Sequence, residues 1–430
     1  MMHPYTEYQQ SDISWLGKVP AHWTKNKFKF LLNDKTKTQN LELPCGSISF
    51  GRVVFKDSER LSEETKAAYQ EVLSGEFLVN PLNLNYDLKS LRTALADIDV
   101  IVSSGYIVLK SLDVVDKEYL KWLLYLFDVR HMKTLGAGIR QTISFKDIAD
   151  CTVYIPSDTE QKSIATFLDR ETQRIDSLIE EKQAFIKLIK EKRQAQISHI
   201  VTKGLNPNVE MQDSGIEWIG QVPKHWIVRR LKQTSTLQSG IAKGKDNAGK
   251  DTLSVPMLRV ANVQDGYVKL DDVHEINVLP HEVERYALKD GDVLMNEGGD
   301  NDKLGRGAVW KEQIKPCIHQ NHVFVIRVND IEPEWLGWLT QSAYAKFYFF
   351  RVSKQSTNLA SISSTNVKEV HLLIPPEDER KLIMEYLKKQ TSKLNQLVHD
   401  VEQSIFLLKE HHTSLISAAV TGKIDVREAV

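Results

Sequence analysis

A segment that carries glycines and lysines, Gly240-Ile-Ala-Lys-Gly-Lys245, comes near to the pattern of a phosphate-binding loop. Such a loop has one more residue before its Gly-Lys pair, and a serine or threonine after the lysine binds magnesium. Here the segment is one residue short, and Asp246 follows the lysine. The pattern is therefore more typical of a basic surface loop than of a nucleotide site.

Two further segments contain groups that could catalyse a reaction on DNA. Glu297-Gly-Gly-Asp300 with Lys303 offers two carboxylates and an amine, as in a nuclease, but the first half of the chain has no counterpart. Asn80-Pro-Leu-Asn83 shares two positions with the Asn-Pro-Pro-aromatic motif of adenine methyltransferases, yet it lacks the second proline and the aromatic residue. No complete catalytic set remains, and the sequence favours a binding protein over an enzyme.

A tryptophan-rich segment occurs twice and organises the chain. Ser11-Asp-Ile-Ser-Trp-Leu-Gly-Lys-Val-Pro-Ala-His-Trp23 returns 203 residues later as Ser214-Gly-Ile-Glu-Trp-Ile-Gly-Gln-Val-Pro-Lys-His-Trp226. We interpret each copy as a structural strap whose indole rings pack on a core, because the part that repeats is poorly suited to reading two different ligands.

A second pair of repeats closes each half. Ile155-Pro-Ser-Asp-Thr-Glu-Gln-Lys162 is matched by Ile374-Pro-Pro-Glu-Asp-Glu-Arg-Lys381, and Val201-Thr-Lys-Gly204 by Val420-Thr-Gly-Lys423, now 219 residues apart. The second half thus holds about 16 more residues between its two repeats. Recurrence at fixed offsets indicates two similar units in tandem.

Residues 158–201 and 377–420 contain no proline or glycine and are expected to form long helices. In the second, an apolar residue recurs every seven positions (Leu387, Leu394, Val401, Leu408 and Leu415), whereas Lys182 and Gln196 interrupt the same pattern in the first. A seven-residue repeat is typical of a left-handed coiled coil. A helix of this length extends about 65 Å, so we expect the two helices to pack on each other, antiparallel.

The segments between strap and helix combine short β-like runs with one helical run. In the first half, β-like runs lie at 47–55, 77–79, 100–102 and 106–109, residues 118–127 have helical spacing, and a glycine-bearing loop at 136–145 is expected to run into a strand. In the second half, the runs at 291–294 and 323–326 resemble the β-like runs at 75–78 and 106–109, and residues 334–339 resemble the start of the helical run at 118–127. The expected fold is α+β, made of two tandem pseudo-symmetric units that share a scaffold and differ in their loops.

Composition is that of an ordinary globular chain: 430 residues with 41% hydrophobic residues and a formal net charge of −1. A neutral total gives no global basic field, although it can hide a local basic face. The three cysteines favour a reducing compartment. Because no apolar run reaches the roughly 20 residues of a membrane span and the N-terminus lacks signal-peptide features, we expect a cytoplasmic location and no membrane partner.

The doubled Trp-Leu/Ile-Gly-x-Val-Pro-x-His-Trp segment, the Ile-Pro-x-x-x-Glu-Gln/Arg-Lys helix start and the Val-Thr-Lys-Gly close resemble the specificity subunit of type I restriction-modification enzymes along nearly the whole chain. Two positions depart from the pattern, both at helix ends: Arg380 stands where the first copy has Gln161, and Gly422-Lys423 inverts Lys203-Gly204. The resemblance implies target recognition domains at 1–155 and 205–374, and long helices at 156–204 and 375–430.

The same resemblance implies the function and the partners. Each target recognition domain would read one block of a split double-stranded DNA site, while the helices set the gap and dock two modification (methyltransferase) subunits. Methylation of adenine, translocation and cleavage would belong to modification and restriction (translocase/nuclease) subunits. The chain itself would therefore need no cofactor, and S-adenosylmethionine, ATP and magnesium would be bound by its partners.

Bases are read by Arg, Lys, Asn and Gln side chains, while further cations hold phosphates. Residues of these types in polar or glycine-bearing loops are the candidate DNA contacts, although for each of them a solvated surface side chain is an equally good interpretation. They are Lys35, Lys37, Arg140 and Gln141 in the first domain, and Lys243, Lys245, Asn301, Lys303, Arg306, Lys354, Gln355 and Asn358 in the second.

Two other functions stay open at this stage. A coiled-coil scaffold protein would explain the helices but not the paired domains with unlike loops. A stand-alone DNA methyltransferase would have to bind S-adenosylmethionine within this chain.

Overall fold

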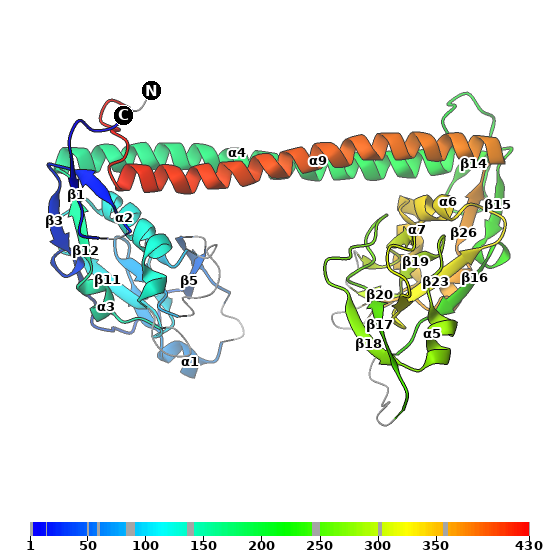
Figure 1. The fold of residues 1–430 in the computed structure, drawn as a ribbon, viewed down its shortest axis with the longest axis horizontal. Helices are drawn as coiled ribbons and strands as arrows, with labels where there is room; N and C mark the ends of the chain where they lie inside the picture. The colour runs from blue at the N-terminus through cyan, green and yellow to red at the C-terminus, as the bar shows by residue number, and fades with distance from the viewer. Residues whose placement is uncertain are drawn as a thin grey trace. The chain divides into compact units, whose positions relative to one another are not determined.

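The computed structural model describes residues 3–13, 15–49, 51–57, 61–82, 91–135, 142–242, 250–299, 303–355 and 360–429. The chain divides into two compact units, the first made of residues 1–182 and 403–430 and the second of residues 183–402. Two long helices, α4 (Asp158–Lys203) and α9 (Glu377–Val420), each contribute to both units (Figure 1). Their bounds confirm the two helices expected from the sequence.

The ends of both helices follow from local sequence. Acidic residues occupy the first turns, where they oppose the positive end of the helix dipole. Gly204 directly follows α4 and Gly422 lies two residues after the end of α9, with positive φ angles of 76° and 68°, a backbone conformation that glycine adopts without a steric penalty. The repeat motifs therefore place acidic residues where each helix begins and a glycine where it ends.

The first unit contains one four-stranded antiparallel sheet and several strand pairs. The sheet has the order β4-β11-β8-β9 (Leu32–Asp34, Ile107–Ser111, Phe77–Val79 and Thr93–Leu95). The pairs are β1 (Tyr8–Gln10) with β2 (Lys18–Pro20), β3 (Thr24–Lys27) with β12 (Thr152–Ile155), β5 (Gly46–Ser49) with β6 (Arg52–Phe55), and β7 (Gln70–Val72) with β10 (Val100–Val102). Its shorter helices are α1 (Glu63–Ala67), α2 (Lys117–Arg130) and α3 (Phe145–Ala149).

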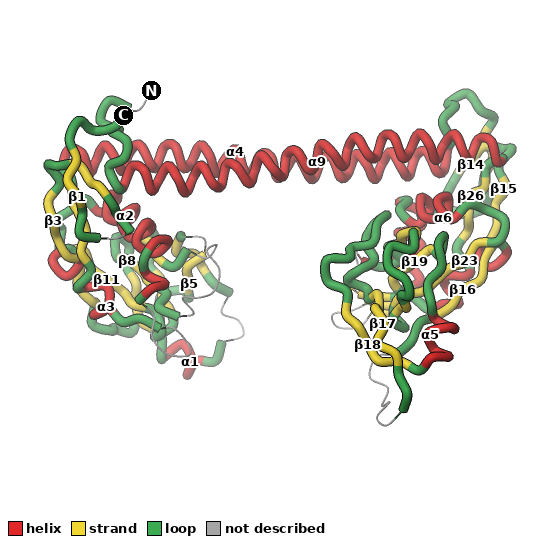
Figure 2. Tube along the Cα trace, in the orientation of Figure 1, coloured by secondary structure: helices red, strands yellow, loops and turns green. Residues whose placement is uncertain are grey.

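The second unit follows the same plan with additional strands. Its four-stranded antiparallel sheet has the order β16-β23-β19-β21 (Ser235–Ser239, Val323–Val328, Val293–Asn296 and Gly307–Val309) (Figure 2). Two pairs repeat those of the first unit: β13 (Met211–Asp213) with β14 (Gln221–Pro223), and β15 (Ile227–Arg230) with β26 (His371–Ile374). Its shorter helices are α5 (Pro280–Tyr286), α6 (Pro333–Thr340), α7 (Ala343–Val352) and α8 (Ser364–Lys368).

The second unit also contains two three-stranded sheets, of which the first repeats the antiparallel pair β5-β6 with the parallel bridge between Cys45 and Ile101 of β10, while the second has no described counterpart in the first unit. One has the order β18-β17-β22 (His274–Val278, Leu253–Leu258 and Ile318–His319), and the other the order β20-β25-β24 (Gly298–Gly299, Ala360–Ser361 and Lys354–Gln355). The longer segment between the repeats in the second half accommodates such additions.

The apolar faces of the long helices complete the core of each unit. In the first unit, Leu168 and Ile175 of α4 share a core with Leu415 and Ile416 of α9. In the second, Ile197 and Val201 of α4 share a core with Ile383 and Leu387 of α9, among other residues. Each target domain is therefore anchored on a two-helix surface. No helix in the described part of the chain is long and apolar enough to cross a membrane.

Two details differ from the sequence expectations. Residues 142–145 do not lead into a strand: α3 begins at Phe145, because Ser144 and Asp147 form a capping box in which the Ser144 amide donates to the Asp147 carboxylate over 2.7 Å. The run at 47–55 is a pair of strands, β5 and β6, because Gly51 turns the chain with a φ of 75°.

Candidate nucleic-acid interface

The repeated tryptophan segment attaches each domain to the first turn of a long helix. In the first unit, Glu160 of α4 is 1% exposed and accepts hydrogen bonds from two residues of the strap and from Tyr5, which precedes it. The Trp23 indole donates over 3.1 Å, the His22 ring lies 2.9 Å away, and the Tyr5 hydroxyl donates to the same carboxylate. Burial raises the pKa of Tyr5, so this phenol stays protonated and serves as a donor.

The second unit repeats this junction with one difference. Glu379 of α9 pairs with His225 at 2.7 Å and accepts from the Trp226 indole over 3.2 Å. The carboxylate is 27% exposed, and Asn208 occupies the position equivalent to Tyr5. Sequence analysis assigned a structural role to the tryptophans, and the buried Trp23 and Trp226 confirm it. The partner glutamates were recognisable only as members of the second repeat.

Lys35, the first of the predicted DNA contacts, lies at the end of β4 and is only 6% exposed. Its ammonium group is 2.8 Å from Glu76 and 3.2 Å from Glu71. Hydrogen bonds from Asn40 and Lys35 lower the pKa of Glu71, which keeps this carboxylate charged. The environment is that of a structural lysine, and it gives no support to the predicted DNA contact.

Lys37 has a different environment. Its side chain is exposed, and its ammonium group donates to the carbonyl oxygen of Ser104 over 2.9 Å. Because that partner is a neutral carbonyl, the charge is available to an anion. Lys37 therefore remains a predicted DNA contact of the first domain.

Four predicted contacts of the second domain gather near the small sheet β20-β25-β24. Lys354 and Gln355 form β24 and are exposed. Lys303 lies against β20: a Cβ added at Gly299 would come within 3.3 Å of the Lys303 Cβ. Arg306 follows three residues later, and its amide donates to the Lys303 carbonyl. These are the residue types that read bases and hold phosphates, on short strands and the turns that follow them.

Hydrogen bonds connect this region to helix α4. The Arg306 guanidinium donates to Gln264 over 3.2 Å, and the next residue, Asp265, pairs with Lys346 of α7 at 2.7 Å. Lys346 also donates to Gln194 of α4 over 2.8 Å. The position of the predicted DNA contacts is thereby coupled to the helix.

A second link runs through Gln341, which follows α6. Its side chain accepts from Arg193 of α4 over 2.8 Å, and Gln194 donates to its backbone carbonyl. Burial lowers the pKa of the Arg193 guanidinium. Sequence analysis missed Arg193 and Gln194, because their partners lie about 150 residues away and no spacing rule marks them.

Six predicted contacts lie outside the described residues: Arg140, Gln141, Lys243, Lys245, Asn301 and Asn358. The tested enzymatic motifs fall partly outside as well, since Asn83 and Asp300 are among the residues without description. Glu297 is described and pairs with His322 at 3.0 Å. Among the described residues, no three His, Cys, Asp or Glu side chains are grouped to hold a metal ion.

Comparison with known proteins places this architecture in a family. The family model described as "Type I restriction modification DNA specificity domain" matches residues 85–188 and 223–405, more than half of the chain. The chain belongs to this family. The two matched segments include nearly half of residues 1–155, most of residues 205–374 and much of both long helices.

Individual relatives of the family are distant. The EcoKI type I restriction enzyme specificity subunit of Escherichia coli is 23% identical, with 63% of this chain and 57% of the relative covered. The MjaVIII specificity subunit of Methanocaldococcus jannaschii is also 23% identical, over 88% of this chain and 87% of the relative. The chain spans about half the length of some curated relatives it matches, 47% and 57% in two cases.

One solved structure supports the fold. A chain from a study of complex assembly and conformational transition of the type I R-M system aligns with a TM-score of 0.66 and 14% identity, covering 94% of this chain and 98% of that chain. At this identity the likeness concerns the α+β fold.

Proposed function

We propose that the chain is the DNA-specificity subunit of a type I restriction-modification complex. It reads the two halves of a split, gapped site on double-stranded DNA, one half with residues 1–155 and the other with residues 205–374. The observation that carries the proposal is the repeated plan of the two units within a family of DNA specificity domains.

The two long helices, α4 and α9, are proposed to form an antiparallel coiled coil within the segments 156–204 and 375–430. Support comes from the seven-residue pattern: Leu387, Val401 and Leu415 are all buried, and Leu394 and Leu408 are partly buried. A split DNA site needs two readers at a fixed distance, and a stiff helical connection provides it better than a flexible linker. Exposed apolar side chains on both helices, such as Leu188 and Leu382, suit the docking of two modification subunits.

The chain is proposed to be non-catalytic and cytoplasmic. Methylation of adenine with S-adenosylmethionine, and ATP- and magnesium-dependent restriction, are assigned to its partner subunits. For base and phosphate contacts, the proposal relies on Lys37 in the first domain and on the group around β24 in the second, together with the six candidates outside the described residues.

Genome-wide mapping of methylated adenines tests the proposal. In a host that carries this chain with its modification subunits, we expect a bipartite motif with a fixed gap, which disappears when the chain is deleted. A continuous palindrome would rule out two separate readers. Tight binding of S-adenosylmethionine by the isolated chain in isothermal titration would instead support a stand-alone methyltransferase, and absence of DNA binding by the assembled complex would support a scaffold.

A further inference from the structure

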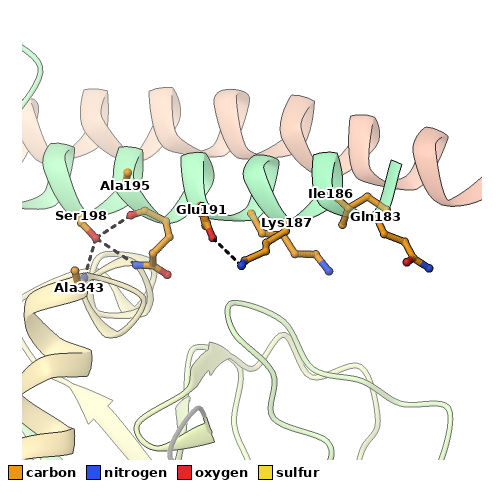
Figure 3. A pocket seen from close by; sticks show the side chains of 9 residues that line it. Gln183, Ile186, Lys187, Glu191, Ala195, Ser198 and Ala343 are labelled. Atoms are coloured by element: carbon orange, nitrogen blue, oxygen red, sulfur yellow. Dashed lines mark hydrogen bonds and ion pairs between the residues drawn. The ribbon is translucent and has the colours of Figure 1, made fainter. Parts of the chain in front are cut away.

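A groove of about 770 Å³ runs along one face of α4 in the second unit. Its lining from the helix includes Ile186, Lys187, Lys190, Glu191 and Gln194, and Ala343 of α7 lines it from the domain. In Figure 3 the labelled side chains of Lys187, Glu191 and Ser198 extend from α4 on the side where Ala343 lies. The Ala343 amide donates to Ser198 over 2.8 Å, which fixes this face of the helix toward the domain.

In the surrounding stretches of both helices, lysines outnumber acidic residues, of which Glu191 lines the groove itself. No aspartate or glutamate occurs between Gln183 and Lys190 in α4, or between Tyr386 and His399 in α9. Lys388 of α9 lines a neighbouring cavity of about 460 Å³ together with Arg193 and Trp338. The net charge of −1 for the whole chain therefore conceals a local excess of basic residues on the helices of this unit.

The amines of Lys187, Lys190 and Lys388 are weakly engaged within the protein. Lys187 is 4.0 Å from Glu191, with side-chain exposures of 80% and 60%, and a pair of this kind contributes little. In the part of the chain that the structure describes, neither Lys190 nor Lys388 lies within 4 Å of a carboxylate. Three lysines are thus available to bind an external anion.

Helix geometry separates these lysines from others nearby. At about 100° per residue, Lys187, Lys190 and Gln194 lie within about 60° of one another around α4. Lys192 is rotated by about 140° from Lys187, on the side of the exposed Phe185. On α9, Lys389 and Lys393 are rotated from Lys388 by about 100° and about 140°. The chain therefore provides matched control lysines on other faces of the same helices.

We propose that Lys187, Lys190 and Lys388 bind the phosphodiester backbone of the unread DNA next to the block that the second domain reads. This inference rests on the proposed function and adds a contact by the helices themselves. Duplex DNA presents a dense row of negative charge, about one per 1.7 Å of its axis, which suits several lysines spaced along the two helices. A protein partner is less well matched, because the large exposed apolar side chains Phe185 and Leu188 lie elsewhere on α4.

The test compares two triple variants of the full chain assembled with its modification subunits: Lys187→Gln with Lys190→Gln and Lys388→Gln, and the control Lys192→Gln with Lys393→Gln and Lys389→Gln. Binding to a fluorescent 40-base-pair duplex of random sequence is measured at several salt concentrations. Removal of one lysine–phosphate interaction lowers the slope of log affinity against log salt by about 0.9, so the slope should fall by about 2.7 in the first variant and far less in the control. The methylated motif should stay unchanged in both.

The outcomes separate the inference from the function on which it rests. If the wild-type complex binds DNA and the two variants retain equal salt slopes, the helices do not contact phosphate and the inference is wrong. If the first variant instead loses its modification subunits with an unchanged slope, the face binds protein. Circular dichroism verifies that each variant stays helical. A wild-type complex that does not bind DNA would overturn the proposed function itself.

Discussion

Single glutamates at the start of α4 and α9 join recognition domain to helix, and the two copies differ in a way that can be measured. Glu160 accepts hydrogen bonds from three side chains and is 1% exposed, whereas Glu379 accepts from two and is 27% exposed. Removing a buried charged acceptor costs its hydrogen bonds and leaves the donors unsatisfied. The first junction should therefore depend more strongly on its carboxylate than the second.

We expect Glu160→Gln to lower the free energy of local opening at the start of α4 by about 2–3 kcal/mol, and Glu379→Gln to lower it by about 1 kcal/mol at the start of α9. The amide that replaces the carboxylate carries no charge and directs hydrogens at the tryptophan and histidine donors. Hydrogen exchange of the first helical turns measures both effects. Lys162→Gln, on the exposed side of the same turn, is the control, and equal losses from all three substitutions would contradict the prediction.

At the scale of elements, sequence predicted the features that local rules determine. The long helices follow from segments without proline or glycine that carry an apolar stripe, and the strap follows from a repeated motif. Even Lys182 and Gln196, which interrupt the stripe, are half-buried at the expected seven-residue positions. These features depend on residues a few positions apart.

The candidate interface was less predictable for a physical reason. Lys35 matched the composition expected of a DNA contact, but its two carboxylate partners come from positions 71 and 76, which only the folded sheet brings near. Arg193 meets Gln341 in the same way. Side-chain partners that are distant in sequence leave no periodic signal, so composition alone cannot separate a structural cation from one that is available to DNA.

The lengths of α4 and α9 are proposed to set the gap between the two DNA blocks. We expect that duplicating residues 175–181 in α4 together with 394–400 in α9 lengthens the gap in the methylated motif by about three base pairs. Seven residues preserve the apolar stripe and add about 10.5 Å to each helix. Because base pairs are stacked about 3.4 Å apart, this length corresponds to about three base pairs. The two blocks themselves should stay unchanged.

A duplication in one helix alone is the matched control. It leaves seven residues without a partner on the facing helix, so the chain should lose stability and modification activity. If methylation mapping showed that the variant with both duplications still methylates the motif with the original gap, the helix lengths would not set the spacing.

At the scale of the whole molecule, the chain makes the same junction twice, once covalently and once through hydrogen bonds. After α4, Leu205-Asn206-Pro207 leads directly into the second strap. After α9, Ile424-Asp425 occupies the positions equivalent to Leu205-Asn206. The Asp425 amide donates to the carbonyl of His3 over 2.8 Å, and His3 directly precedes Pro4, the equivalent of Pro207. The Tyr8 hydroxyl also donates to the Gly422 carbonyl over 3.1 Å.

This correspondence predicts that the chain tolerates circular permutation. The permuted variant opens between Asn206 and Pro207, which are both exposed, and joins residue 429 to residue 3 through about four Gly-Ser residues. The junction after α9 then becomes covalent, and the junction after α4 is held by hydrogen bonds alone. We expect this variant to fold with a thermal midpoint within a few degrees of the original and to direct methylation to the same motif. Opening between Val228 and Arg229 instead cuts β15, which pairs with β26 over four residues, and should prevent folding of the second unit. If both permuted chains failed while the original chain carrying the same Gly-Ser residues at 206–207 stayed folded, the two junctions would not be equivalent.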